Sequence, residues 1–252
     1  MNDKPSITIP QGLVEALRTA RRVTVLTGAG ISAESGLPTF RDAQTGLWAN
    51  FRPEELATAE AFLRNPRMVW EWYAWRRELI EKAQPNAGHE ALVAIGLHVP
   101  RLTVITQNID GLHQRAGGND VIELHGNISR VKCFTENIVI ETWQNSDEIP
   151  PRCPRCGDLL RPEVVWFGEM LPEKAFEQAV EASANCDVFF SIGTSGMVEP
   201  AASLPKVAQK LGAVVAIINL DVTPLVSPKL YHINGPAGTV LPQLVSMAWD
   251  ER

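Results

Sequence analysis

The stretch Val23-Thr-Val-Leu-Thr-Gly-Ala-Gly-Ile-Ser-Ala33 decides the fold. Its first four residues are apolar or β-branched, which predicts a buried strand over residues 23–26. Gly28 and Gly30 end that strand, and residues 31–35 are expected to open a helix. A strand that leads through a glycine turn into a helix attracts phosphate, because free backbone N–H groups and the helix dipole both favour an anion. The spacing fits the Gly/Ala variant of the dinucleotide fingerprint, which is a weak signal on its own.

Composition narrows the class of protein. The chain has 252 residues, enough for one or two domains with a full core. Its 45% hydrophobic and 21% charged residues are typical of a globular protein, and the net charge of −6 argues against a general nucleic-acid or membrane surface. No secretion signal or membrane-spanning run is visible, and the four cysteines suit a reducing compartment and a metal better than a disulfide framework. We expect a cytoplasmic monomer that binds neither nucleic acid nor membranes.

Strand and helix patterns alternate at both ends of the chain, with two insertions between them. Buried strands are expected at residues 23–26, 102–106, 121–124, 164–167, 188–192 and 213–219. Helices are expected at residues 10–22, 90–97, 172–184, 200–211 and 238–249. This order predicts an α/β fold, a doubly wound parallel (Rossmann-like) sheet built from residues 1–36, 84–128 and 163–252. A second, smaller domain is expected from a helical insertion, 37–83, and a degenerate zinc-ribbon module, 129–162.

Small and polar residues follow several of the expected strands. In an open parallel sheet, ligands bind beyond the carboxyl ends of the strands. The segments that end strands in this way are Gly28–Ser32, Gln107–Asp110, His125, Gly193–Ser195, and Asn219 with Asp221. Loops after strands are often merely polar, but several that carry Gly, Asn, Asp and His together favour a cofactor site.

The chain has five histidines, and only His125 stands at a strand end facing the expected crevice. A neutral imidazole can take up a proton near pH 7, so His125 is the candidate general base. His89 and His113 are expected to cap or orient their neighbours, and His98 and His232 to be surface or turn residues.

The sequence resembles the sirtuins, the NAD-dependent protein deacylases, of bacterial and archaeal type. Gly28-Ala-Gly-Ile-Ser32 and Gly36-Leu-Pro-Thr-Phe-Arg41 follow the family pattern, with Leu37 in place of Ile and Thr39 in place of Asp. Thr106-Gln-Asn-Ile-Asp110 matches without a change, and Glu123-Leu-His-Gly126 matches the segment that bears the family's catalytic histidine. The later matches are Gly193-Thr-Ser195 and Asn219-Leu-Asp221, on the adenosine side, and Val164-Val-Trp-Phe-Gly-Glu169, which pairs with the substrate peptide.

The resemblance implies a reaction between NAD and acyl-lysine proteins or peptides. Nicotinamide leaves as the acyl carbonyl oxygen attacks the ribose, His125 helps to deprotonate a ribose hydroxyl, and the products are free lysine and O-acyl-ADP-ribose. Asp110 counters developing positive charge, Asn108 orients a water or ribose, and Phe40 shields the reactive carbon from solvent. The implied NAD contacts are Gly28, Ala29, Gly30, Ile31, Ser32, Phe40, Arg41, Gln107, Asn108, Ile109, Asp110, Gly193, Thr194, Ser195, Asn219, Asp221 and Ala237. The implied peptide contacts are Val164, Phe167 and Gly168.

The metal-binding pattern departs from a four-cysteine site. Cys153 and Cys156 form one Cys-x-x-Cys pair, but Cys133 is followed by Glu136 where a second cysteine belongs. Either zinc is bound by the three thiolates with Glu136 or water as the fourth ligand, or the module folds without metal. Cys186, which leads into a sheet strand, is expected to be a small buried residue.

The tryptophan-rich helical segment suggests which acyl group is removed. Tyr73 and Arg76 share a helix face, and the neighbours of Arg76 at helical spacing are uncharged. With Ala57, this Tyr-x-x-Arg pattern resembles the acidic-acyl class (class III) of sirtuins, in which the three residues form a wide pocket that binds a distal carboxylate. The resemblance implies removal of succinyl and malonyl groups, and it leaves removal of acetyl groups open.

Other readings stay open at this point. The enzyme could be a plain NAD-dependent deacetylase, and a non-catalytic NAD-binding regulatory module would need no histidine at the crevice. A classical dehydrogenase would need an acidic ribose-binding residue about 20 residues after the glycine loop, which is missing here. A zinc-ribbon nucleic-acid protein would explain the cysteines but not the sheet or the acidic balance.

Overall fold

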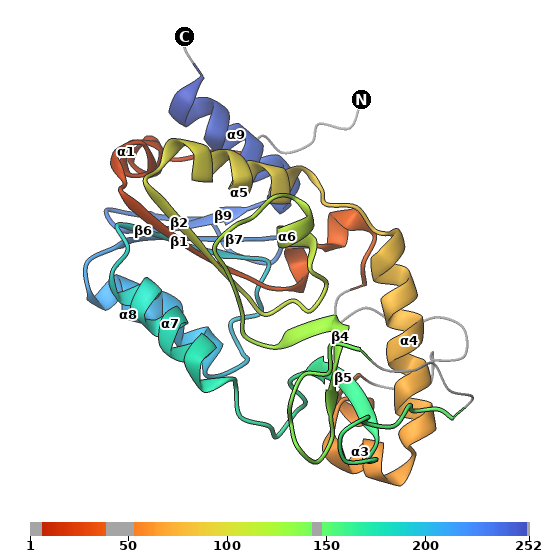
Figure 1. Ribbon diagram of the computed structural model, residues 1–252. Helices are drawn as coiled ribbons and strands as arrows, with labels where there is room; N and C mark the ends of the chain where they lie inside the picture. The colour runs from red at the N-terminus through yellow and green to blue at the C-terminus, as the bar shows by residue number, and fades with distance from the viewer. Residues whose placement is uncertain (1–6, 39–52, 143–147, 251–252) are drawn as a thin grey trace.

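The computed structural model describes residues 7–38, 53–142 and 148–250 (Figure 1). Within these ranges the chain forms a large domain around a seven-stranded sheet and a smaller domain beside it. No helix in the described ranges is long and apolar enough to cross a membrane.

The large sheet has the strand order β3-β2-β1-β6-β7-β9-β8. Its strands are β1 (Arg22–Thr27), β2 (Arg101–Thr106), β3 (Val121–Glu123), β6 (Val188–Ile192), β7 (Val214–Asn219), β8 (Leu225–Ser227) and β9 (Leu230–Asn234). All adjacent pairs are parallel except β8 with β9. The chain winds outward in both directions from β1, so the topological switch point lies between β1 and β6, where a doubly wound sheet binds its ligand. The parallel sheet and its doubly wound order confirm the predicted α/β fold.

Helices cover both faces of the sheet (Figure 1). On one face, α1 (Gln11–Thr19), α5 (Ala87–His98) and α9 (Ala237–Trp249) pack with the sheet residues in one apolar core. On the other face, α7 (Glu173–Ala184) and α8 (Leu204–Lys210) form a second core with residues such as Leu26 and Phe189. Strands buried on both faces read as continuous apolar runs, which is why β1 and β6 were visible in the sequence.

The small domain combines a helical segment with a two-stranded antiparallel sheet. Its helices are α2 (Pro53–Leu56), α3 (Ala59–Arg64) and α4 (Pro66–Lys82), and its strands are β4 (Gly126–Cys133) and β5 (Leu160–Val164). Thr58 and Asn65 cap α3 and α4, because each side-chain oxygen accepts a backbone N–H of the first turn. A buried aromatic cluster that includes Phe62, Trp72 and Trp166 joins these elements.

Several local expectations were wrong. The strand expected at residues 164–167 is β5, which ends at Val164 and belongs to the small sheet. Val165 N–H still bonds to the His125 carbonyl (2.9 Å), in the register of the β4–β5 pair, whereas Phe167 N–H donates to the Ala57 carbonyl (2.9 Å) outside the ladder. The segment after β1 forms two 3₁₀ turns, Ala29–Ile31 and Ala33–Ser35, and no α-helix, because Gly36 ends it in the left-handed region (φ 81°).

Three short elements had not been expected from the sequence. They are α6 (Leu112–Arg115), β8 and β9. His232 therefore lies in a strand, whereas a surface or turn position was expected for it. These elements are three to five residues long, too short for a hydrophobic period to be recognised in the sequence, and β8 is also largely exposed.

Candidate active site

The loops after β1 and β6 meet at the switch point and exclude side chains from it. Gly28 N–H donates to the Ile192 carbonyl and Gly30 N–H to the Gly193 carbonyl, both at 3.0 Å. A Cβ on Gly30 would lie 2.6 Å from Gly193 Cα, and one on Gly193 would lie 2.5 Å from the backbone nitrogen of Ile31. Only glycine fits these positions, so the two backbones form one tight, side-chain-free floor at the carboxyl ends of the central strands. Such a floor suits a dinucleotide, whose pyrophosphate needs a close approach to the backbone.

A buried polar network lies beside this floor. Asn108 Nδ2 donates to the Gly28 carbonyl (3.1 Å) and to Ser32 Oγ (3.2 Å), and Ser32 Oγ donates to Asp110 Oδ2 (2.7 Å). The other carboxylate oxygen of Asp110 accepts the Leu112 N–H (2.9 Å). The structure therefore brings together the predicted residues Ser32, Asn108 and Asp110, with each buried side chain held in one orientation.

His125 lies at the edge of the same region, two residues after β3. Its Nδ1 lies 2.9 Å from the Gln107 carbonyl oxygen. Burial lowers the pKa of His125 below that of a free imidazole, while the bond to Gln107 partly opposes this shift. The ring is therefore neutral at pH 7, as a general base must be.

The expected adenosine-side residues follow β6 and β7. Asn219 Nδ2 donates to the Thr194 carbonyl (2.7 Å) and ties the two strand-end loops together. Thr194 Oγ1 pairs with Ser191 Oγ (3.0 Å), and Ser195 and Asp221 are exposed. Ala237 is the first residue of α9, where the next N–H, that of Gly238, donates to Glu34 Oε2 (2.7 Å). Phe40 and Arg41 lie outside the described residues.

A second set of hydrogen bonds, made by hydroxyl and imidazole groups, lies next to this network and was not expected from the sequence. Thr27 Oγ1 donates to Thr106 Oγ1 (2.9 Å) and also bonds to His113 Nε2 (2.9 Å), and Thr106 Oγ1 accepts the backbone N–H of Asn108 (3.0 Å). His89 packs against His113 with ring centroids 4.9 Å apart, and its Nδ1 completes the cap of α5 by accepting the Asn86 N–H. The expectation that His89 and His113 cap or orient their neighbours is confirmed.

Two cavities lie away from the strand-end residues. One of about 30 Å³ lies beside His89 and His113, room for about one water molecule. A polar groove of about 480 Å³ lies at the amino ends of the strands, where Arg22 and Arg101 line it, opposite the candidate site.

The expected acyl-pocket residues lie on the small-domain side. Tyr73 is 3% exposed in the cluster that Ile109 and Val164 also contact, and burial raises its pKa. Burial lowers the pKa of Arg76, while electrostatic interactions with Tyr73 and Asp110 oppose this shift. Arg76 therefore lies within electrostatic range of both the phenol and the carboxylate of the polar network. The bond between Phe167 N–H and the Ala57 carbonyl brings two more of the predicted substrate residues together, and Gly168 follows on the exposed surface.

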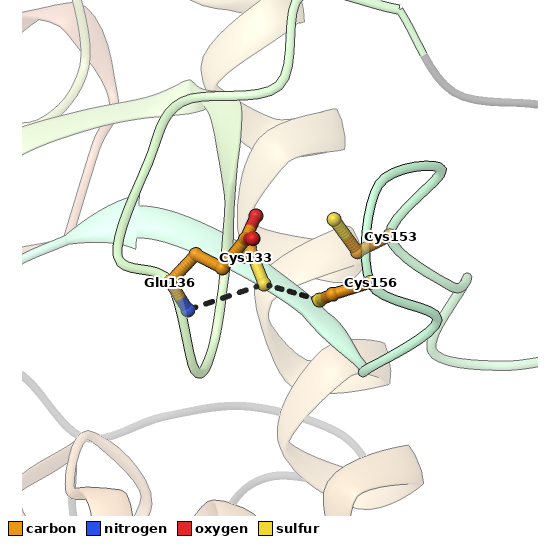
Figure 2. Close-up of side chains that lie close together, drawn as sticks. All are labelled: Cys133, Glu136, Cys153 and Cys156. Carbon is orange, nitrogen blue, oxygen red and sulfur yellow. Dashed lines mark hydrogen bonds between the residues drawn. The ribbon is translucent and has the colours of Figure 1, made fainter.

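Three of the four cysteines converge in the small domain (Figure 2). One sulfur or oxygen atom each from Cys133, Glu136, Cys153 and Cys156 lies within 4.8 Å of every other. Cys133 Sγ lies 3.4 Å from Cys156 Sγ and accepts the Glu136 N–H at 3.4 Å (Figure 2). Three sulfurs and one carboxylate so close together fit a tetrahedral zinc site. Cys186 lies apart, partly buried in the large-domain core.

A glycine floor at the switch point, a buried amide–hydroxyl–carboxylate network and a neutral histidine define an α/β protein built to act on a dinucleotide. A family model described as the Sir2 family matches residues 28–200. The chain belongs to this family, the sirtuins.

Relatives and solved structures agree with this assignment. An NAD-dependent protein deacylase of Aquifex aeolicus is 54% identical over 220 residues, which cover 87% of this chain and 92% of the relative. An NAD-dependent protein deacylase 1 of Pseudomonas aeruginosa is 44% identical over 247 residues, 95% of this chain and 99% of the relative. Among solved structures, a Sir2 homologue in complex with NAD superposes with a TM-score of 0.86 at 43% identity, covering 96% of this chain and 94% of the homologue.

Proposed function

We propose that the protein is an NAD-dependent protein-lysine deacylase that removes succinyl and malonyl groups, beside acetyl, from acyl-lysine proteins. NAD supplies a ribose carbon that becomes electrophilic when nicotinamide leaves. The deacylase names of the relatives and the residues at the switch point support the general reaction. A non-catalytic module would not need a neutral, oriented histidine beside the floor.

His125 and Asp110 have different roles in the proposed reaction. His125, with its Nδ1 on the Gln107 carbonyl, offers Nε2 as the base that takes a ribose hydroxyl proton. Asn108 and Ser32 fix the direction of the Asp110 carboxylate, so that its charge is preorganised toward the developing positive charge.

The observation that carries the acyl preference is the place of Arg76. It lies on α4 one turn from Tyr73, and its guanidinium is within electrostatic range of Asp110 at the dinucleotide site. A guanidinium and a neutral phenol one turn apart on α4 suit a carboxylate at the far end of an acyl chain. Acetyl-lysine has no such carboxylate, so these groups would not add to its binding.

The test compares Arg76→Met with the parent protein on succinyl-lysine and acetyl-lysine versions of one peptide. A charge-assisted hydrogen bond contributes about 1.5–3 kcal/mol, so kcat/KM for the succinyl peptide should fall by about 10- to 100-fold more than for the acetyl peptide. Arg67→Met is the matched control, because Arg67 is exposed on the same helix and pairs with Glu71. Equal losses on both peptides would refute the acyl preference, and no NAD-dependent nicotinamide release with any acyl peptide would refute the deacylase reaction.

The proposal includes a structural zinc ion. Cys133, Cys153 and Cys156 would be its thiolate ligands and the Glu136 carboxylate the fourth. Arg155 Nε donates to Glu136 Oε2 (3.2 Å), which holds that carboxylate in position beside the sulfurs. The ion would join the loop after β4 to the loop before β5 and so stabilise the small domain.

A further inference from the structure

The hydroxyl group of Tyr73 is hydrogen-bonded to the side chain of Trp166. Trp166 is 1% exposed, and its Nε1–H donates to the hydroxyl oxygen of Tyr73 at 3.0 Å. The two residues are 93 positions apart in the sequence and come from α4 and from the segment after β5. Phe62 packs against the indole with ring centroids 5.3 Å apart, so the pair lies in a buried aromatic environment.

This bond determines what the Tyr73 hydroxyl can do. An indole N–H is a donor only, so the phenol oxygen must accept and its own proton must point elsewhere. No acceptor for that proton is found in the described ranges of the chain. Because burial raises the pKa of Tyr73 far above neutrality, the phenol keeps its proton and is a hydrogen-bond donor at physiological pH.

Trp166 is itself fixed on several sides. The Arg161 guanidinium, 3% exposed, lies 3.3 Å from the centre of the indole ring. The backbone N–H of Trp166 donates to Glu169 Oε2 at 2.8 Å, and that same oxygen accepts a hydrogen bond from Arg161 Nη2 at 2.9 Å. The residue before it, Val165, bonds to the His125 carbonyl. The indole is therefore a rigid support, tied to the loop that carries the candidate base.

We propose that Trp166 is a positioning residue for acyl selectivity, which aims the Tyr73 proton at the distal carboxylate of the acyl group by occupying the acceptor side of the hydroxyl. The inference deepens the proposed function and rests on it. Without the indole N–H, the phenol could turn its proton away from the carboxylate. The loss would appear in succinyl and malonyl substrates and not in acetyl.

The test is a double-mutant cycle of Trp166→Phe and Tyr73→Phe, with kcat and KM measured on succinyl and acetyl peptides. Trp166→Phe removes the neutral hydrogen bond between Trp166 and Tyr73. This loss should raise the succinyl KM by about 2- to 12-fold relative to the acetyl KM, with kcat little changed. In the Tyr73→Phe background, Trp166→Phe should have no further effect on the succinyl-to-acetyl ratio. Trp70→Phe is the control, because Trp70 is also a buried tryptophan (9% exposed) and lies on the same helix as Tyr73.

The outcomes separate this inference from the proposed function. A parent enzyme without succinyl activity would overturn both. A parent enzyme whose desuccinylation depends on Arg76, but whose selectivity is unchanged by Trp166→Phe or changed equally in both backgrounds, would overturn the inference alone. If Trp166→Phe does not fold, 3-benzothienylalanine at position 166 decides the matter, because it keeps the shape of the indole and removes only the N–H.

Discussion

The Nδ1 atom of His125 lies 2.9 Å from the carbonyl oxygen of Gln107. A carbonyl can only accept, so Nδ1 carries the proton of the neutral ring and Nε2 carries the lone pair. One backbone bond thus sets both the tautomer of the candidate base and the direction in which it takes up a proton. Gln107 is the residue after β2 and His125 follows β3, the strand that pairs with β2. The loop after β2 therefore orients the candidate base.

Replacing His125 by alanine should reduce turnover by about 10²- to 10⁴-fold, the usual contribution of a general base. NAD binding, measured by titration, should persist because the glycine floor and the Asn108 network are unchanged. In the parent enzyme, kcat/KM should be retained at neutral pH and fall as the pH drops through the His125 pKa, which burial sets below the ordinary 6.5.

His98→Ala provides the control for this variant, because His98 is exposed at the end of α5, before the amino end of β2, and stacks on Trp249. Near-normal turnover in His125→Ala would show that another group is the base.

Protein purified without chelator should contain about one zinc per chain by metal analysis, with less than a tenth of an equivalent contradicting the proposed site. Cys153→Ser should lose the metal and lower the melting temperature, because it removes one of three thiolates. Cys186→Ser, outside the cluster, should keep the zinc content of the parent.

Glu136→Cys tests the fourth ligand separately. If the Glu136 carboxylate occupies that position, a thiolate in its place should slow zinc release to a chelator, since zinc binds thiolate well. An unchanged release rate in both Glu136→Cys and Glu136→Ala would mean that the side chain at position 136 does not bind the metal.

The fold was predictable where the sequence carries a local period. Strand β6 was expected at residues 188–192 and has those bounds, and β2 extends one residue beyond the expected start. Both are buried runs of apolar residues between turns. Strands β8 and β9 were missed because they are only three and five residues long, and β8 is a largely exposed edge strand.

The candidate site was predictable in its strand-end residues and not in its long-range bonds. Ser32, Asn108, Asp110 and His125 follow directly from the rule that ligands lie beyond parallel strands. The bond between Thr27 and His113 joins residues 86 apart, and that between Trp166 and Tyr73 joins residues 93 apart. Neither pair has a spacing that a helix or strand would impose, so only the folded structure brings them together.

The buried His113 should make stability depend on pH. Burial and the nearby His89 lower the pKa of His113 to about 3, while in the unfolded chain it returns to about 6.5. The unfolded state therefore binds more protons below pH 6.5. The contribution of His113 to stability is fully present above that pH and is lost as the pH falls from 6.5 toward 3.

Changing His113 to glutamine removes the titration while keeping a side-chain N–H that can reach Thr27 Oγ1. Between pH 6.5 and 4, the free energy of unfolding of the parent should fall more steeply than that of His113→Gln, by up to about 1.4 kcal/mol per pH unit. Urea unfolding at a series of pH values measures both slopes. Parallel curves for the parent and His113→Gln would mean that His113 gains its proton as easily in the folded protein as in the unfolded chain. The series of hydrogen bonds from His113 through Thr27 and Thr106 to the Asn108 N–H would then not require a neutral imidazole at position 113.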